Sequence, residues 1–310
     1  MTSRHGQVVV ITGGSSGIGL ATALRLSADG ASVVLASRGE HALARAAQQC
    51  EAAGGTALTV PTEIADSDAV DALLERAVQR FGHVDAVVQG ASVLAYGRFE
   101  DVPPEVFRRV IETNVIGVAN VARSALRVFT AQEHGNLVVL GSVVGKISTQ
   151  LMSNYQTSKW AMHGLVRSLQ IEVRRTPGVH VCVVTLCSVD TPIYTQAGNY
   201  SGWQGRPPPP VYSPERVARH VVDVVDHPQR DRSVGFANWF MVLGFRLFPR
   251  LYDRLAAPLM ESLAVTTVAV PPGPGNVAEP HENAEELHGR WKRGSLPGLV
   301  WRVVSKARRR

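Results

Sequence analysis

The feature that most constrains this fold is a regular alternation of short apolar runs with helical stretches. The apolar runs cover residues 7–12, 31–37, 56–60, 84–88, 136–141 and 179–186. Apolar residues at helical spacing follow most of them, over residues 17–29, 40–53, 67–81, 105–131 and 154–174. Strands that are apolar on both faces and are joined by helices form parallel sheets with right-handed crossovers. The sequence therefore predicts an α/β fold, a Rossmann-like doubly wound parallel sheet with helices on both faces.

Composition and cysteine content narrow the class of protein. The 310-residue chain is 45% hydrophobic and 19% charged, which is ordinary for a globular protein. Its cysteines, Cys50, Cys182 and Cys187, have neither disulfide nor metal-ligand spacing, so we expect reduced thiols, no metal site and a cytoplasmic location. No signal-peptide pattern precedes the first apolar run, and the apolar stretch at 234–245 is too short to span a bilayer.

A glycine-rich turn follows the first apolar run. It reads Thr12-Gly13-Gly14-Ser15-Ser16-Gly17-Ile18-Gly19 and opens the first helical stretch. Glycines permit a tight turn and let backbone N–H groups approach a pyrophosphate, while the helix N-terminus supplies partial positive charge. Strand, turn and helix in this order favour a dinucleotide site over a plain structural turn.

The end of the second apolar run bears on which dinucleotide would bind. A carboxylate there is typical of NAD sites, because it hydrogen bonds to the ribose 2′-hydroxyl. This chain has Ser37-Arg38 instead. A guanidinium pairs with a 2′-phosphate, so the sequence favours NADP over NAD, with a solvated surface arginine as the alternative.

A tyrosine and a lysine lie one helical turn apart in the stretch 154–174. Tyr155 and Lys159 therefore share a helix face, and Ser142 ends the fifth apolar run, at the edge where parallel sheets place their ligands. We expect the ammonium group to lower the pKa of the phenol, which gives a general acid/base near neutral pH. Tyr and Lys at this spacing are more often a plain surface pair. Together with Ser142 and the glycine-rich turn, they indicate catalysis.

These motifs in combination resemble those of the classical short-chain dehydrogenase/reductase family. The resemblance covers about residues 5 to 235. The matching segments are the TGxxxGxG turn at 12–19, the helix motif Asn114-Val115-Ile116-Gly117, the catalytic serine, tyrosine and lysine as Ser142, Tyr155 and Lys159, and the nicotinamide-contacting segment Asp190-Thr191-Pro192.

The resemblance implies an oxidoreductase that interconverts an alcohol and a carbonyl by hydride transfer. Tyr155 would donate or remove the proton on the substrate oxygen, and Ser142 would position that oxygen. Lys159 would bind the nicotinamide ribose and lower the tyrosine pKa. Asn114 would hold a helix kink and a water in a proton relay. The expected cofactor contacts are Gly13, Ser15, Ser16, Gly17, Ile18, Gly19, Ser37, Arg38, Glu63, Ile64, Gly90, Ala91, Asn114, Tyr155, Lys159, Val189 and Thr191.

The chain departs from the family pattern at three places. Gln89-Gly90-Ala91-Ser92 replaces the usual Asn-Asn-Ala-Gly, Glu63 replaces an aspartate near the adenine, and Leu186-Cys187 replaces a Pro-Gly. The first and third changes keep a second hypothesis open, a dinucleotide-binding regulatory or scaffold protein without turnover. The intact Ser142, Tyr155 and Lys159 argue against that alternative.

The C-terminal third is organised differently. Residues 193–212 contain four consecutive prolines and predict a loop, and Ser213-Pro214-Glu215 is typical of a helix start. Residues 236–270 are apolar and aromatic with interspersed arginines; core or subunit packing, a cover for the substrate pocket and contact with a membrane surface all stay open. The Pro- and Gly-rich residues 271–280 predict a linker.

We therefore expect three parts. Residues 1–235 form the dinucleotide-binding and catalytic domain, 236–270 a helical extension, and 271–310 a linker with a basic tail. The tail carries no acidic residue from Arg290 onward, and a solvated tail is favoured over one bound to lipid or nucleic acid. The expected partners are NADP, a small alcohol or carbonyl substrate and a second copy of the chain, with no nucleic acid.

Overall fold

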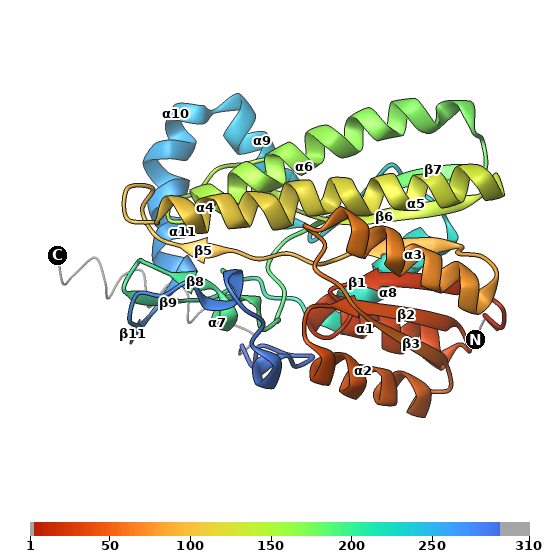
Figure 1. Cartoon of the computed structure of the whole chain (residues 1–310). Coiled ribbons are helices and arrows are strands. Elements are labelled where there is room, and N and C mark those ends of the chain that lie inside the picture. Colours follow the sequence, from red (N-terminus) through yellow and green to blue (C-terminus); the bar gives the residue numbers. More distant parts are fainter. Residues whose placement is uncertain (1–2, 292–310) are drawn as a thin grey trace.

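A seven-stranded parallel sheet forms the centre of the computed structural model, which describes residues 3–291 (Figure 1). The strand order is β10-β7-β6-β4-β1-β2-β3, and every neighbouring pair is parallel. The strands are β1 (Val8–Thr12), β2 (Ser32–Ser37), β3 (Thr56–Pro61), β4 (Ala86–Gln89), β6 (Gly135–Ser142), β7 (Val179–Leu186) and β10 (Asp231–Val234). The predicted doubly wound sheet is confirmed. Its order reverses between β1 and β4, which opens a ligand crevice at the carboxyl ends of these strands.

Two helical layers cover the sheet because strand side chains alternate between its faces. In β1, Val9 and Ile11 belong to one apolar cluster, whereas Val8 and Val10 belong to the other. The first layer is α1 (Gly17–Ala28), α2 (Glu40–Ala52) and α8 (Pro214–Asp226); the second is α3 (Ser67–Phe81), α4 (Pro104–Ile111), α5 (Val118–Gln132) and α6 (Ser153–Glu172). Burial on both faces explains why the strands are continuously apolar.

Helix ends follow their sequence signals. The Asp66 carboxylate accepts hydrogen bonds from the backbone N–H groups of Asp68 (2.9 Å) and Ala69 (3.3 Å) at the start of α3. The Ser213 hydroxyl accepts a hydrogen bond from the backbone N–H of Arg216 (3.3 Å) at the start of α8, which confirms the predicted helix start. These caps satisfy backbone groups that a helix leaves unpaired.

The predicted helix over residues 105–131 is continuous but not uniform. Between α4 and α5 it widens into a π-helix, η1 (Glu112–Gly117), which contains Asn114. Single π-helical turns are frequent at functional positions. The helix is therefore irregular at Asn114, and the kink expected there stays a prediction.

Several short elements escaped the sequence prediction. The edge strand β10 has the polar sequence DRSV, which gives no strand signal. The expected loop at 193–212 holds α7 (Ile193–Gln196), β8 (Gly198–Asn199) and β9 (Trp203–Gly205). Strand β8 pairs with β5 (Ala95–Tyr96), away from the main sheet.

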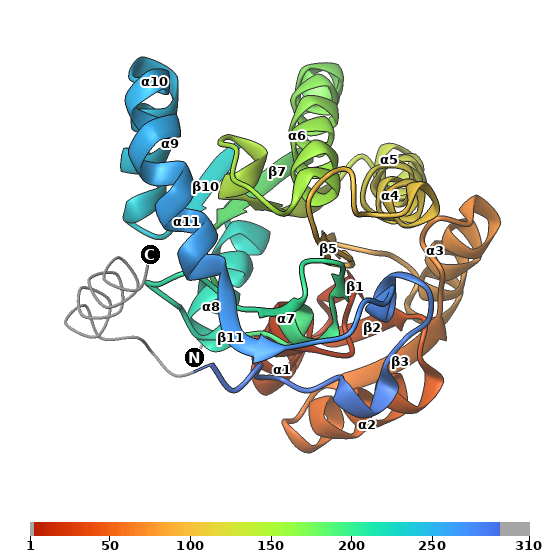
Figure 2. The ribbon, with the colours of Figure 1, turned by 90° about the vertical axis from the view of Figure 1, so that its left-hand side faces the viewer.

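The apolar extension forms a helical column beside α6 (Figure 2). It comprises α9 (Ala237–Leu247), α10 (Pro249–Leu251), the π-helix η4 (Tyr252–Ala256) and α11 (Ala257–Ala264), followed by β11 (Val265–Ala269). Its inner side chains, among them Met241, Phe245 and Tyr252, pack on Tyr96 and Ile147. Its outer face exposes Phe236, Trp239, Phe240, Leu247, Phe248, Leu251 and Leu255. Among residues 3–291, no helix is long and apolar enough to cross a membrane.

Residues 274–291, here called the C-terminal strap, fold back across the carboxyl edge of the sheet and reach α2 (Figure 2). The strap contains two 3-10 turns, η5 (Gly275–Val277) and η6 (Glu282–Ala284). Part of the segment predicted as a linker, 271–280, contacts the rest of the protein: the Asn276 carbonyl accepts a hydrogen bond from Arg38. The expected basic tail falls mostly on 292–310, outside the described residues.

Candidate active site

One cavity of about 290 Å³ lies at the carboxyl edge of the sheet. It runs from the glycine-rich turn to α6, and it gathers side chains from β2, β6 and the loop after β7. Of the expected site residues, all but Asn114 line it: Gly13, Ser15, Ser16, Gly17, Ile18, Gly19, Ser37, Arg38, Glu63, Ile64, Gly90, Ala91, Ser142, Tyr155, Lys159, Val189 and Thr191. Segments far apart in the sequence thus meet in one place.

The glycine-rich turn leaves no space for side chains. Gly13 (φ +69°) and Gly17 (φ +51°) adopt left-handed backbone conformations. A Cβ atom at Gly19 would lie 2.1 Å from the Gly13 carbonyl oxygen, and one at Gly13 would lie 2.8 Å from the Ala91 nitrogen. The turn therefore forms a bare backbone cradle at the N-terminus of α1, which fits the phosphates of a dinucleotide.

The altered segment after β4 keeps its supporting contacts. The Gln89 amide donates to the Ala91 carbonyl (2.9 Å), and the Thr12 hydroxyl accepts from the backbone N–H of Gly90 (3.2 Å). Gln89 therefore bonds to the backbone of its own loop, and Gly90 is held against the end of β1.

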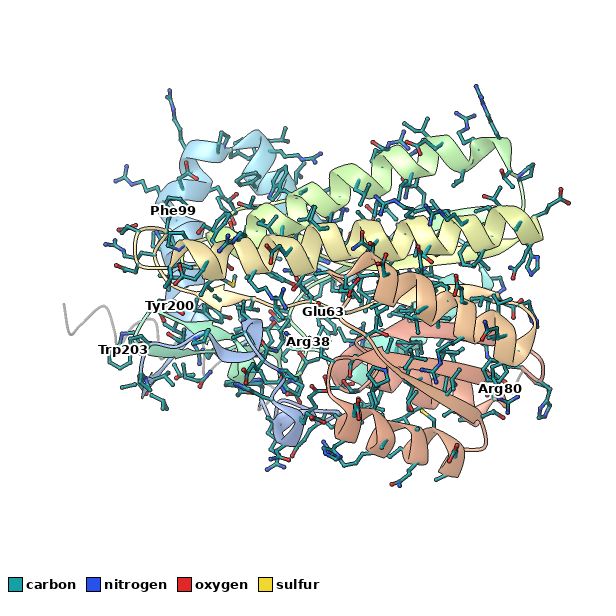
Figure 3. All side chains as sticks on the ribbon, viewed as in Figure 1. Arg38, Glu63, Arg80, Phe99, Tyr200 and Trp203 are labelled. Atoms are coloured by element: carbon teal, nitrogen blue, oxygen red, sulfur yellow. The ribbon has the colours of Figure 1, made fainter. Side chains whose placement is uncertain are left out.

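Arg38 and Glu63 lie side by side after β2 and β3 (Figure 3). The Glu63 carboxylate is 3.8 Å from Arg38 and accepts a 2.9 Å hydrogen bond from Arg109. The Arg38 guanidinium also donates to the backbone carbonyl of Asn276 in the strap (2.5 Å). Burial is the largest effect on Arg38 and lowers its pKa, while Glu63 raises it. Arg38 is therefore partly desolvated and is held by the Asn276 carbonyl and Glu63, unlike a freely solvated surface arginine.

Ser142, Tyr155 and Lys159 meet at the opposite end of the cavity. Ser142 ends β6, and Tyr155 and Lys159 share one face of α6. The Lys159 ammonium lies 5.4 Å from the centroid of the Tyr155 ring and donates to the Leu140 carbonyl (3.2 Å). The arrangement places one phenol, one ammonium group and one hydroxyl around a common space.

Burial is the largest effect on the pKa values of Tyr155 and Lys159. It raises the pKa of Tyr155 to about 12, and the hydroxyls of Ser142 and Ser92 act in the opposite direction. It lowers the pKa of Lys159 to about 8. Desolvation of the phenol is the largest of these effects on Tyr155, so the lowering of its pKa by Lys159 stays a prediction. At pH 7 the phenol is neutral and the lysine is mostly protonated.

Asn114 lies behind the cavity wall. Its amide nitrogen donates to the Val93 carbonyl (2.7 Å) and to the Ser158 hydroxyl (3.0 Å), and its oxygen accepts from the Val93 N–H (2.9 Å) and the Ser92 hydroxyl (3.1 Å). The side chain thus ties the loop after β4 to α6, next to Tyr155. Within the described chain it acts as a structural clamp, and its backbone sits in the π-helix η1.

The cavity beside Tyr155 is largely apolar. Two further tyrosines, Tyr96 and Tyr194, face it, and burial raises the pKa of both well above the usual value. The apolar side chains that line this part are Leu94, Val143, Val144, Met152, Ile193 and Met241. The apolar extension therefore contributes Met241 to the pocket wall. A cover for the substrate pocket was one of the roles that the sequence left open for this segment.

Sequence reasoning missed several polar residues of the cavity, and four of them bear directly on the site. Ser92 was noted only as a departure from the family pattern, and Tyr194 directly follows a matched motif. Asn276 and Glu285 lie on the strap, in the segment expected to be a linker or tail. Cys187 also lines the cavity, and burial raises the pKa of its thiol to about 12, which disfavours the thiolate form. Across residues 3–291, no cluster of three His, Cys, Asp or Glu side chains could hold a metal ion.

Known proteins share this organisation. The family model described as short chain dehydrogenase matches residues 7–200. An uncharacterized oxidoreductase of Bacillus subtilis, YxnA, is 34% identical over 257 residues, which is 82% of this chain and 72% of the relative. An uncharacterized oxidoreductase of Listeria monocytogenes, Lmo0432, is 30% identical over 236 residues, covering 74% of this chain and 94% of the relative.

Solved structures agree with the sequence comparison. A short-chain type dehydrogenase/reductase from Mycobacterium marinum superposes with a TM-score of 0.67 at 25% identity, covering 76% of this chain and 96% of that one. An alcohol dehydrogenase from Thermococcus sibiricus, in complex with 5-hydroxy-NADP, gives a TM-score of 0.63 at 28% identity, covering 74% and 94%. The chain therefore belongs to the short-chain dehydrogenase/reductase family of oxidoreductases.

Proposed function

We propose that this protein is an NADP(H)-dependent oxidoreductase that interconverts a secondary alcohol and a carbonyl compound. One observation carries the proposal: a single cavity is lined at one end by the glycine cradle and Arg38, and at the other by Ser142, Tyr155 and Lys159. The cradle and Arg38 would hold the phosphates, and Lys159 would hold the nicotinamide ribose. When bound, the nicotinamide supplies or accepts the hydride.

Each side chain of the catalytic group has a distinct task. The Tyr155 phenol, neutral at pH 7, would donate its proton to the carbonyl oxygen during reduction and remove it during oxidation. The protonated Lys159 would stabilise the phenolate that proton donation leaves behind. The Ser142 hydroxyl would hold the substrate oxygen. The surrounding apolar side chains would exclude water, which strengthens these interactions.

The same apolar lining supports a substrate class. Leu94, Met152 and Met241 would bury an apolar body, while Ser142, Tyr155 and Lys159 would supply the polar groups around the reacting oxygen. We therefore infer a neutral ketone or secondary alcohol with a hydrophobic body as the substrate. Assay of the purified protein with NADPH and a panel of such ketones, followed by the absorbance of reduced nicotinamide, tests the activity. Turnover that favours charged ketones over neutral apolar ones would contradict this choice.

Replacing Arg38 with alanine is expected to weaken NADPH binding by about 10- to 100-fold and NADH binding by less than about threefold. The reason is that only NADPH offers a 2′-phosphate for a charge-assisted hydrogen bond. Titration by nucleotide fluorescence measures both dissociation constants. The matched control is Arg127→Ala, because Arg127 pairs with Asp71 on the surface (3.2 Å) and does not line the cavity. Equal weakening of both nucleotides in Arg38→Ala would refute the preference for NADP.

The outer face of α9–α11 is where a second copy of the chain or a membrane surface would bind. It combines exposed Trp239 and Phe240 with Arg246 and Arg250 of the same column. Homo-oligomerisation and peripheral membrane contact both stay predictions. Light scattering after gel filtration tests the first, and flotation with anionic liposomes tests the second.

A further inference from the structure

The carboxylate of Glu285 lies inside the cavity that would hold the dinucleotide. It lines that cavity together with Ser15, Arg38 and Asn276. Burial is the largest effect on Glu285 and raises its pKa, while the Ser15 hydroxyl and the charge of Arg38 act in the opposite direction. Its Oε2 atom is buried and has no hydrogen-bond partner among the described residues. The strap thus brings an incompletely paired anion into the site.

Neighbouring strap residues hold this carboxylate in place. On one side, the carbonyl of Glu286 accepts a hydrogen bond from the backbone N–H of Gly17 (3.0 Å), in the glycine cradle. On the other, the Glu282 carboxylate accepts from the backbone N–H groups of His41 (2.7 Å) and Ala42 (3.1 Å) at the start of α2. The strap is therefore anchored on two helix N-termini, and Glu285 lies between the anchors.

Further contacts extend along the strap. The Gln196 amide donates to the Ala284 carbonyl (2.8 Å), and the backbone N–H of Trp291 donates to the Asp190 carboxylate (2.8 Å). Gly39 packs so closely that a Cβ atom there would lie 2.6 Å from the Glu282 side chain. The strap therefore packs firmly against the body of the protein and forms one side of the cavity.

Arg38 also contacts the C-terminal strap. Its guanidinium donates to the Asn276 carbonyl and interacts with the charges of Glu63 and Glu285. A 2′-phosphate paired with this guanidinium would enter the part of the cavity that Ser15 and Glu285 also line. Two anions cannot share this space without strong repulsion, because the surroundings are partly desolvated.

We propose that Glu285 is a specificity-determining residue for the cofactor, a tethered anion that competes with the 2′-phosphate for Ser15 and Arg38. The inference rests on the proposed NADP function. A cofactor with a 2′-phosphate must displace the Glu285 carboxylate, whereas a ribose 2′-hydroxyl can donate a hydrogen bond to it. Glu285 therefore weakens binding of the phosphorylated cofactor more than binding of the unphosphorylated one.

The test compares Glu285→Gln with Glu286→Gln in the full-length chain. The probes are adenosine 2′,5′-bisphosphate, which carries the 2′-phosphate without a nicotinamide, and AMP, which lacks it; calorimetric titration gives each dissociation constant. Glu285→Gln is expected to tighten the bisphosphate about tenfold and AMP less than about twofold. Glu286 is the matched control, because its carboxylate pairs with Arg290 on the surface (2.9 Å) and its backbone carbonyl is unchanged.

Three outcomes would overturn the inference: equal tightening of both probes by Glu285→Gln, no tightening, or equal tightening by Glu286→Gln. Amide hydrogen exchange gives a second readout. Displacement predicts faster exchange over residues 282–291 when the bisphosphate binds, whereas slower exchange would show closure over the ligand and contradict competition. A chain that meets these expectations yet turns over no alcohol or carbonyl with NADP(H) would instead refute the proposed function.

Discussion

Replacing Tyr155 with phenylalanine is expected to lower kcat by about 100- to 10,000-fold while dinucleotide affinity changes less than about threefold. The reason is that the proposed mechanism assigns transfer of the substrate proton to the Tyr155 hydroxyl, which phenylalanine lacks. The ring packs within the apolar cluster around Ile147, so phenylalanine keeps its packing. Steady-state kinetics and nucleotide titration on the same preparation check both parts.

Tyr252→Phe is the matched control for this variant. Tyr252 belongs to the same apolar cluster, but its hydroxyl donates to the Ser148 carbonyl (2.9 Å) and it does not line the cavity. We expect a loss of about 1 kcal/mol in unfolding free energy and no large change in kcat. If Tyr155→Phe keeps more than about a tenth of the activity, proton transfer by Tyr155 is refuted.

Replacing Gly19 with alanine is expected to abolish dinucleotide binding and to lower the free energy of unfolding by about 1–3 kcal/mol or more. The added Cβ would lie 2.1 Å from the Gly13 carbonyl oxygen, so the turn itself must move. Moving the turn removes the backbone cradle that the phosphates require. Nucleotide titration and urea denaturation measure the two effects.

Gly164→Ala controls for the glycine-to-alanine change. Gly164 lies within α6, and a Cβ atom there would meet nothing within 4 Å. Alanine at an open helical position is expected to stabilise the protein by about 0.5–1 kcal/mol and to leave binding unchanged. A Gly19→Ala protein with normal nucleotide affinity would show that the cradle is not the phosphate site.

The sheet and the helix faces were predictable because their signals are local. The residues from Val8 to Ile11 are all apolar and alternate between the two faces of the sheet, as expected of a strand buried on both faces. The edge strand β10 gave no such signal, because its polar residues face solvent on most sides. Pattern therefore predicts buried elements better than exposed ones.

The chemistry of the site was predictable only in part. Spacing placed Tyr155 and Lys159 on one helix face, but the pKa of Tyr155 depends on burial by segments that no local pattern brings together. Arg38 donates a hydrogen bond to Asn276, which lies 238 residues further along the sequence. The Pro- and Gly-rich composition of the strap could therefore not reveal this contact. The apolar substrate half likewise draws on several distant segments, from Leu94 to Met241.

Titration of the purified full-length protein with NADPH and, separately, with NADH tests the central claim most directly. Both nucleotides can be followed by their fluorescence without knowledge of the substrate. The account predicts saturable binding of both nucleotides, with NADPH the tighter of the two because Arg38 would pair with its 2′-phosphate. If neither nucleotide bound saturably, the dinucleotide site would be contradicted. If NADH bound more tightly than NADPH, the assignment of NADP would be contradicted.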